Sequence, residues 1–133
     1  MEIPVYLFTG FLESGKTKFI QETLEDKRFY HKGTTLVLLC EEGEVELDKS
    51  KFQCGNTVVE IIDSKEDLNP DRIFELEKKH KVARVIIEYN GMWEINHLFN
   101  SIPSDWIVYQ QMTFFDSKTV MTYNANMRNL VVD

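Results

Sequence analysis

The residues with the most specific chemistry lie near the start of the chain, in the segment Gly10-Phe-Leu-Glu-Ser-Gly-Lys-Thr17. This segment matches the pattern Gly-x-x-x-x-Gly-Lys-Thr of phosphate-binding loops. Glycines let backbone N–H groups surround phosphate oxygens, the lysine neutralises the outer phosphates, and the threonine hydroxyl ligates Mg²⁺. The motif therefore predicts a site for a nucleoside triphosphate with magnesium.

The elements that flank the motif support this prediction. An apolar run over residues 3–9 is rich in strand formers, and residues 15–27 place Phe19, Ile20 and Leu24 on one helical face. A strand before the loop and a helix after it would direct the positive end of the helix dipole at the phosphates. The alternative is a glycine-rich turn with a chance lysine.

The rest of the chain alternates predicted strands and helices. Apolar runs predict strands at residues 34–40, 57–62, 82–88 and 105–114, and helices are expected at 70–81, 93–100 and 118–128. Near-continuous apolar runs are typical of strands buried on both faces of a parallel sheet. We therefore predict an α/β fold of three layers, the P-loop NTPase fold, with a mostly parallel sheet flanked by helices.

Length and composition limit the class of protein. A chain of 133 residues is the size of one domain, and its formal net charge of −7 argues against nucleic-acid binding. No apolar stretch approaches the roughly 20 residues of a membrane span, and residues 3–8 lack the basic leader and length of a signal peptide. Cys40 and Cys54 have neither metal-motif nor disulfide-framework spacing. We expect thiols in a cytoplasmic protein with no nucleic-acid or membrane partner.

Histidines and aromatic residues give little further information about a functional site. His31, His80 and His97 are too dispersed to predict a metal site. Aromatic side chains gather late in the chain, Trp93 and Trp106 among them, and are expected in the core or against helices. If the chain is part of a longer protein, some could form an interface.

Residues 8–17 resemble the opening of the CobW-type GTPases, relatives of the HypB and UreG metallochaperones, which commonly contain Thr-Gly-Phe-Leu-Gly-Ser-Gly-Lys-Thr-Thr. Two further segments occur in the same order. Residues 40–48, Cys-Glu-Glu-Gly-Glu-Val-Glu-Leu-Asp, are similar to the family's Asn-Glu-Phe-Gly-Glu-Val-Gly-Ile-Asp. Residues 85–91, Val-Ile-Ile-Glu-Tyr-Asn-Gly, are similar to its apolar strand ending in Glu-Thr-Ser-Gly. The resemblance spans nearly the whole chain.

The motif and the resemblance together imply a set of site residues. The nucleotide would contact Gly10, Glu13, Ser14, Gly15, Lys16, Thr17, Lys18 and Gly91. The Mg²⁺ environment would consist of Thr17, Glu41 and Glu88, and catalysis would rest on Lys16, Thr17 and Glu88. Residues 43–48 would form a switch segment, and the Gly91 N–H would meet the γ-phosphate.

Without the family, Glu88 still ends a predicted buried strand at its carboxyl edge, where open α/β sheets bind ligands. A carboxylate there can hold Mg²⁺ or its waters. The alternatives are a strand-end charge in solvent for Glu88 and a solvated acidic loop for residues 41–48.

The chain departs from the family in three places, and Glu13 is unusual in the phosphate loop. The Cys-x-Cys-Cys metal motif expected after the third strand is replaced by Ile-Ile-Asp-Ser-Lys-Glu at residues 61–66. Lys18 stands at the second threonine, which commonly approaches the α-phosphate, and Glu13 introduces a carboxylate into the phosphate loop. The guanine-selecting Asn-Lys-x-Asp lies on a later strand in the family and does not occur in these residues. GTP is therefore implied by the resemblance, and ATP stays open.

The end of the sequence bears on domain organisation. The apolar run at residues 130–133 is expected to begin a further strand. We therefore predict a single P-loop nucleotide-binding domain over residues 1–133 that ends before the base-specificity motif.

Three functions follow. The first is a GTPase that assists metal or cofactor delivery, whose partner would be a client metalloprotein or the missing C-terminal part. Its turnover would be slow because no arginine lies in the motifs. The arginines of the chain are Arg28, Arg72, Arg84 and Arg128, all outside the motifs. The second is a small-molecule kinase, which would need an acceptor site and an arginine-rich lid. The third is a non-catalytic nucleotide-binding or interaction module.

Overall fold

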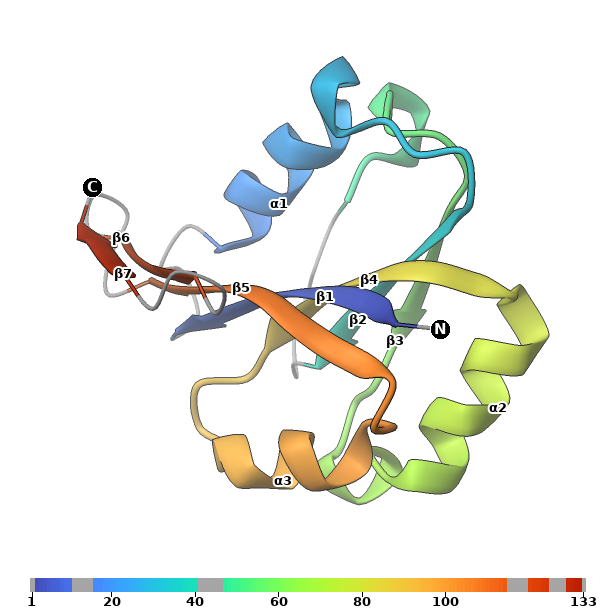
Figure 1. Cartoon of the computed structure of the whole chain (residues 1–133), viewed down its shortest axis with the longest axis vertical. Helices are drawn as coiled ribbons and strands as arrows, with labels where there is room; N and C mark the ends of the chain where they lie inside the picture. Colours follow the sequence, from blue (N-terminus) through green and yellow to red (C-terminus); the bar gives the residue numbers. More distant parts are fainter. Residues whose placement is uncertain (1, 11–15, 41–46, 115–119, 125–128, 133) are drawn as a thin grey trace.

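The computed structural model describes residues 2–10, 16–40, 47–114, 120–124 and 129–132. Strands and helices alternate along most of this length (Figure 1). The strands are β1 (Ile3–Gly10), β2 (Thr34–Cys40), β3 (Thr57–Ile61), β4 (Val82–Tyr89), β5 (Trp106–Phe114), β6 (Val120–Asn124) and β7 (Asn129–Val132). The helices are α1 (Lys16–Glu25), α2 (Pro70–His80) and α3 (Ile95–Ser101), with the 3-10 turns η1 (Lys27–Phe29), η2 (Lys49–Lys51) and η3 (Lys65–Asp67).

All seven strands belong to one sheet in the order β3-β2-β4-β1-β5-β6-β7. Strands β3, β2, β4, β1 and β5 pair in parallel, whereas β6 and β7 pair in antiparallel fashion. Helix α1 covers one face of the sheet, and α2 and α3 cover the other (Figure 1). The predicted three-layer α/β arrangement with a mostly parallel sheet is therefore confirmed.

The core lies on both faces of the central strands. On the α1 side, Val37 of β2 belongs to an apolar cluster with Ile20 and Leu24. On the opposite side, its neighbour Leu36 belongs to a cluster with Ile73 of α2. Because successive strand residues point to opposite faces, β2 and β4 need apolar residues at nearly every position, which explains their continuous apolar runs.

Helix α2 begins and ends at residues that local sequence rules identify. The Asn69 side chain caps it by accepting a hydrogen bond of 2.9 Å from the Arg72 N–H, and Pro70 lies in the first turn. Lys81 adopts the left-handed conformation, with φ of 51°, and ends the helix. The helix predicted for residues 70–81 is therefore confirmed to within one residue.

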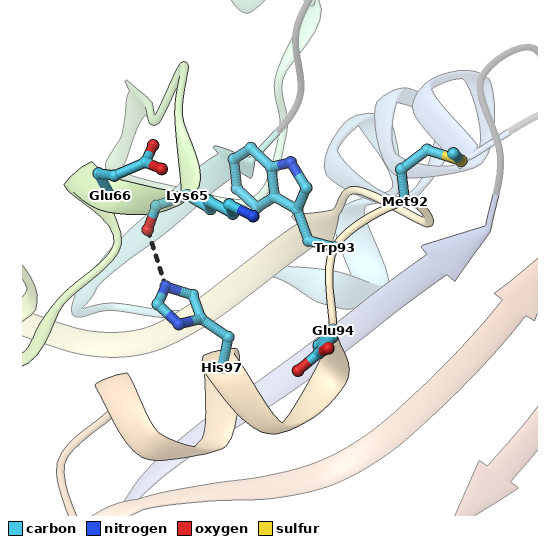
Figure 2. A pocket seen from close by; sticks show the side chains of 6 residues that line it. All are labelled: Lys65, Glu66, Met92, Trp93, Glu94 and His97. Atoms are coloured by element: carbon cyan, nitrogen blue, oxygen red, sulfur yellow. Dashed lines mark hydrogen bonds between the residues drawn. The ribbon is translucent and has the colours of Figure 1, made fainter.

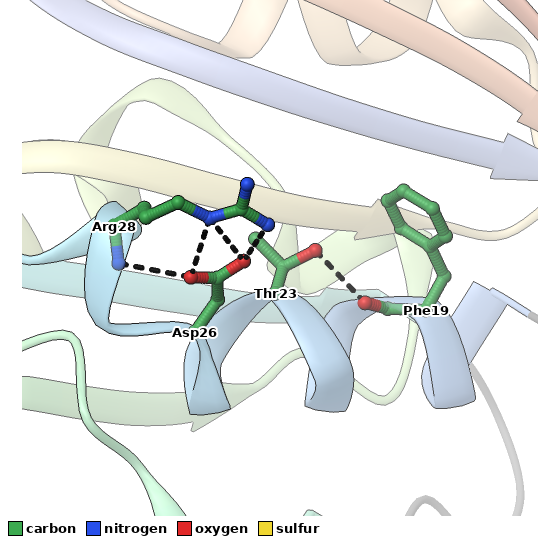
Figure 3. A network of polar contacts seen from close by, with 4 residues as sticks. All are labelled: Phe19, Thr23, Asp26 and Arg28. Carbon is green, nitrogen blue, oxygen red and sulfur yellow. Dashed lines mark hydrogen bonds and ion pairs between the residues drawn. The ribbon is translucent and has the colours of Figure 1, made fainter.

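Helix α1 ends two residues earlier than predicted. Near its end the Thr23 hydroxyl donates to the Phe19 carbonyl at 2.9 Å (Figure 3). The chain then turns into η1, where the Asp26 carboxylate accepts from the Arg28 backbone N–H and from its guanidinium, with 2.7 Å to Nη2. These hydrogen bonds hold the pKa of Asp26 at about 2. Asp26 thus competes successfully with continuation of the helix.

The helix predicted for residues 118–128 is wrong over residues 120–124, which form β6. Val120, Thr122 and Tyr123 are residue types that favour strands, and β5 offers an edge with unpaired backbone groups. β6 pairs with that edge, for example Met112 with Thr122. The strand expected from residue 130 is present as β7, but it returns along β6 as an antiparallel partner.

The remaining predictions concern boundaries and chemical state. Helix α3 spans residues 95–101, near the predicted 93–100, and Trp106 is buried as expected. Cys40 and Cys54 are both buried as thiols. None of the helices in the described part of the chain has the length and apolar character needed to cross a bilayer.

The amino ends of the strands are held together by a buried arginine. Arg84 of β4 is 5% exposed and donates to the Thr35 hydroxyl at 2.6 Å and to the Phe29 carbonyl at 2.5 Å. It also reaches the Cys54 carbonyl at 3.4 Å, and its guanidinium lies 3.8 Å from the centre of the Phe29 ring. Burial lowers the pKa of this guanidinium, and the hydroxyl and carbonyl acceptors replace the water that the charged group has lost.

We predict that Arg84→Leu lowers the free energy of unfolding by about 3 kcal/mol, because the Thr35 hydroxyl and the carbonyls of Phe29 and Cys54 lose a donor. Chemical denaturation measures the change. The control is Arg72→Leu on α2, whose side chain makes a 3.4 Å surface pair with Glu75. That variant should stay within about 0.5 kcal/mol of the unmodified chain. Equal stability of the two variants would show that the Arg84 contacts contribute nothing.

Candidate functional site

The candidate site lies at the carboxyl edge of the central strands. β1 ends at Gly10, and α1 begins at Lys16, so the phosphate motif connects a buried strand to a helix as predicted. Gly10 has φ of 139°, a conformation that side chains disfavour and glycine adopts readily. The first glycine of the motif is therefore required by the backbone where the loop leaves the strand.

Two predicted residues from distant parts of the sequence meet at this edge. The Thr17 hydroxyl, in the first turn of α1, hydrogen-bonds the Glu88 carboxylate, with 3.1 Å to Oε1 and 3.0 Å to Oε2. Glu88 is 0% exposed. A strand-end charge in solvent, the alternative for Glu88, is therefore wrong. The two oxygens at similar distances show that the whole carboxylate faces the start of the helix.

Strand register explains why Glu88 is buried. β4 lies between β1 and β2, and Glu88 stands opposite Phe8 on one side and Leu39 on the other. A carboxylate in this position has lost its water and needs donors from the protein. Thr17 is one donor that the strand–loop–helix connection supplies.

A second polar contact joins β1 to its other neighbour. The hydroxyls of Thr9 and Thr113 lie 3.0 Å apart, next to Gly10. Thr113 follows from the register between β1 and β5, where it stands opposite Thr9. Thr113 is not among the predicted site residues, although a polar residue near the end of an apolar strand is a usable signal for this edge.

The connection between β4 and α3 carries Gly91. Asn90 organises it as a turn: its side chain accepts from the Met92 N–H at 2.8 Å and its carbonyl from the Trp93 N–H at 3.1 Å. Gly91 is exposed in this turn. Its position directly after the Glu88 strand end is that of a loop able to meet a ligand at the carboxyl edge.

Tyr89, which is not among the predicted site residues, connects Glu88 to the start of α3. Its hydroxyl donates to the Glu94 carbonyl at 2.6 Å, and its ring meets Trp93 edge-on with centroids 5.9 Å apart. Burial raises the pKa of Tyr89 to about 12, so the hydroxyl keeps its proton. A large aromatic where the CobW-type pattern has threonine was the available signal.

The acidic segment is anchored where its described part begins. Gln21 of α1 accepts from the Asp48 N–H at 2.8 Å and donates to the Asp48 carbonyl at 3.1 Å. Leu47 packs against the α1-side core. These contacts tie the end of the proposed switch segment to the helix that follows the phosphate motif, while residues 43–46 lie outside the described residues.

The structure does not bring every predicted site residue into view. Glu13, Ser14, Gly15 and Glu41 lie outside the described residues. Lys16 is the first residue of α1, but its side chain is not among those described. Lys18 is exposed on α1.

The arginines of the described chain lie elsewhere. Arg28 and Arg72 pair with surface carboxylates, and Arg84 is buried at the amino ends of the strands. Within the described residues, the site therefore has no arginine that could offset developing phosphate charge.

The donor set fits a magnesium ion. Mg²⁺ prefers hard oxygen ligands and is usually held by one or two carboxylates or hydroxyls together with water and phosphate oxygens. The Thr17 hydroxyl and the buried Glu88 carboxylate are such donors, and they already lie within 3.1 Å of each other. These two residues are the part of the described chain that could hold Mg²⁺ beside a triphosphate.

Comparison with known proteins agrees with this geometry. The model of one family, described as CobW/HypB/UreG, nucleotide-binding domain, matches residues 4–127. The match includes both the phosphate motif and the Glu88–Gly91 segment. The chain belongs to the CobW/HypB/UreG family. No curated protein and no solved structure matches it significantly.

Family membership confirms the P-loop NTPase fold and a nucleotide-binding function of the GTPase type. The structure also shows where the segment lies that replaces the cysteine motif of the CobW/HypB/UreG family. Residues 61–66 run from the end of β3 into η3, at the same edge as Glu88. Ile61 is exposed and Ile62 is buried, and the exposed Asp63 and Glu66 follow them, so this segment offers carboxylates where the family pattern offers thiolates.

The Thr17–Glu88 contact makes a prediction that needs no nucleotide. In chelator-treated protein, Thr17→Val should lower the free energy of unfolding by about 2 kcal/mol, because a buried carboxylate loses a hydroxyl donor. Thr17→Ser keeps the hydroxyl and should remain within about 0.5 kcal/mol of the unmodified chain. Denaturant titration measures both. A valine variant as stable as the serine variant would contradict the importance of this hydrogen bond.

Proposed function

We propose that this protein binds GTP with Mg²⁺ and hydrolyses it slowly, in support of metal or cofactor delivery to a client metalloprotein. The observation that carries the proposal is the hydrogen bond between Thr17 and the fully buried Glu88 at the start of α1. It combines a helix start, a hydroxyl and a carboxylate at the carboxyl edge of a parallel sheet, which is where nucleotides and their Mg²⁺ bind in this fold.

The backbone of the phosphate motif would hold the β- and γ-phosphates. In the proposal, N–H groups from Gly10 to Thr17, including those of Glu13, Ser14 and Gly15, surround the phosphate oxygens. The Glu13 side chain would have to point into solvent, since a carboxylate among the phosphates would weaken binding.

Side chains would complete the nucleotide site. Lys16 would neutralise the outer phosphates, and Lys18 would lie near the α-phosphate. The Gly91 N–H would meet the γ-phosphate from the turn after β4, and Glu41 would extend the metal environment from the acidic segment.

Catalysis would rest on positioning and electrostatics rather than on covalent chemistry. Thr17 and Glu88 would fix the position of the metal and its waters, and Lys16 would stabilise charge that develops on the γ-phosphate. When bound, Mg²⁺ neutralises charge on the β- and γ-phosphates. Since the described residues bring no arginine to the site, turnover without a partner should be slow.

The proposal also covers the base of the nucleotide and the identity of the partner. GTP is favoured over ATP by family membership alone, because the residues that select guanine in the family are not among these 133. The partner would be a client metalloprotein, or the remaining part of a longer protein of which residues 1–133 form one nucleotide-binding domain. Buried thiols at Cys40 and Cys54 suit a reducing cytoplasm.

A non-catalytic nucleotide-binding module is the second candidate. It is favoured by the absence of an arginine near Thr17 and Glu88 among the described residues and by a carboxylate, Glu13, inside the phosphate motif. Such a module would bind GTP with Mg²⁺ and act through protein contacts without turnover.

The decisive test measures nucleotide binding by calorimetry and phosphate release in single-turnover assays. Lys16→Ala should reduce phosphate release by about 100-fold or more, because the γ-phosphate loses its main positive charge. Glu88→Gln should raise the Mg²⁺ concentration needed for half-maximal turnover, since a neutral amide is a poorer ligand. The control is Lys27→Ala, an exposed lysine on η1 away from the site, which should leave turnover unchanged.

The outcomes separate the candidates. Unchanged turnover in Lys16→Ala, with folding intact by circular dichroism, would exclude hydrolysis at this site. Nucleotide binding without any turnover would favour the non-catalytic module, and no binding of GTP or ATP would exclude both.

A further inference from the structure

A cavity of about 380 Å³ lies beside the turn that carries Gly91, between η3 and the start of α3 (Figure 2). Its lining residues come from two chain segments that are about 30 residues apart in sequence. They are Lys65, Glu66, Met92, Trp93, Glu94 and His97. His97 closes one side by donating from Nε2 to the Lys65 carbonyl at 2.7 Å.

Carboxylates dominate the charge around this cavity. Glu66 and Glu94 are both exposed, and neither carboxylate forms an ion pair with any residue in the described ranges. Asp63 and Asp67 lie in the same short segment as Glu66, so three carboxylates in residues 63–67 outnumber the single amine of Lys65. The described residues do not arrange three or more His, Cys, Asp or Glu side chains to hold a metal ion. The cavity therefore suits an organic cation rather than a metal.

Trp93 and Met92 form an apolar wall of the cavity, and this wall sets a second requirement for a ligand. Trp93 is half-buried, its ring lies against Tyr89, and its indole N–H has no hydrogen-bond partner within the described part of the chain. Met92 beside it is 78% exposed. An indole face attracts a guanidinium or ammonium group, and an unpaired indole N–H calls for an acceptor. A ligand that offers both a cation and a carbonyl would satisfy this wall.

We propose that the cavity binds an arginine side chain, together with its backbone carbonyl, from a partner protein. The guanidinium would stack on Trp93 and pair with Glu66 and Glu94, since a planar guanidinium does both at once. The partner's carbonyl would accept from the Trp93 N–H. Free alkylamines supply the charge but no carbonyl, which is why we assign a peptide as the occupant. The exposed Met92 thioether offers apolar contact to the arginine stem.

The cavity is linked to the nucleotide site through Tyr89. This residue follows Glu88, which holds Thr17, and its hydroxyl holds the Glu94 carbonyl at the cavity. Gly91 and Met92 are consecutive residues of one turn. A γ-phosphate at Gly91 would therefore bias the arrangement of Met92 and Trp93. Peptide and nucleotide would change each other's affinity by the same factor. This coupling rests on the proposed function, whereas the peptide site does not.

Peptide binding can be tested on the full chain without nucleotide. The probe is acetyl-Gly-Arg-Gly-amide, and Trp93 fluorescence is the readout, since the other of the two tryptophans, Trp106, is 3% exposed and donates to Glu77. We expect saturable binding. The citrulline analogue, which lacks charge, should bind about tenfold more weakly, and agmatine, which lacks the carbonyl, about fivefold more weakly.

Matched charge variants locate the site. Glu66→Gln combined with Glu94→Gln should weaken the arginine peptide about tenfold. The control combines Glu22→Gln with Glu75→Gln, two exposed glutamates on α1 and α2 that make the same change in net charge away from the cavity. This control should bind the peptide normally. Absence of saturable binding, equal affinity for agmatine, or equal loss in both double variants would overturn the peptide site.

Coupling is tested by repeating the titration with a non-hydrolysable GTP analogue and Mg²⁺. The peptide affinity should change about threefold or more, and Tyr89→Phe should abolish that change, so that the variant binds the peptide with the same affinity, within about twofold, with and without the nucleotide analogue. An unchanged affinity on nucleotide-loaded protein would overturn the coupling. Failure of the analogue to bind at all would instead count against the proposed function and the coupling, and the nucleotide-free titration would still decide the peptide site.

Discussion

Burial of a carboxylate in the middle of a sheet costs free energy unless polar groups of the protein meet it. Glu88 is such a carboxylate, fully buried at the end of β4 between β1 and β2, and the Thr17 hydroxyl meets it. For this contact to form, β1 must lie next to β4 and α1 must start directly above their ends. The order of strands, the length of the phosphate motif and the direction of α1 are all consistent with that single requirement.

The buried polar groups at the amino ends and at the carboxyl ends of the strands have different roles. At the amino ends, Arg84 satisfies a hydroxyl and backbone carbonyls from three segments, and its charge serves stability. At the carboxyl ends, the polar groups are grouped around Glu88, Thr9 and Tyr89, where the strands give way to loops. Within the strands, buried polar groups are concentrated at these two edges because the strand interiors, covered on both faces, leave room only for apolar side chains.

Most of the fold could be predicted because its signals are local. The apolar runs of β2 and β4 are set by burial on both faces, and Asn69 with Pro70 identifies the start of α2 from two adjacent residues. For residues 120–124, local signals led to the wrong prediction of a helix. Their sequence permits a helix or a strand, and the outcome depended on an open edge of β5, which no local pattern reveals.

Residue types at short spacing are enough to predict the phosphate motif, its strand–loop–helix setting and the position of Glu88 at a strand end. The burial of Glu88 and its hydrogen bond to Thr17 arise only in the folded chain, since these residues are 71 positions apart and meet through strand order. The fold likewise connects Glu88, through Tyr89, to Trp93 and Glu94, beside a cavity shared with η3. Contacts between distant segments arise from how the parallel strands are ordered in the sheet, and spacing along the chain does not encode that order.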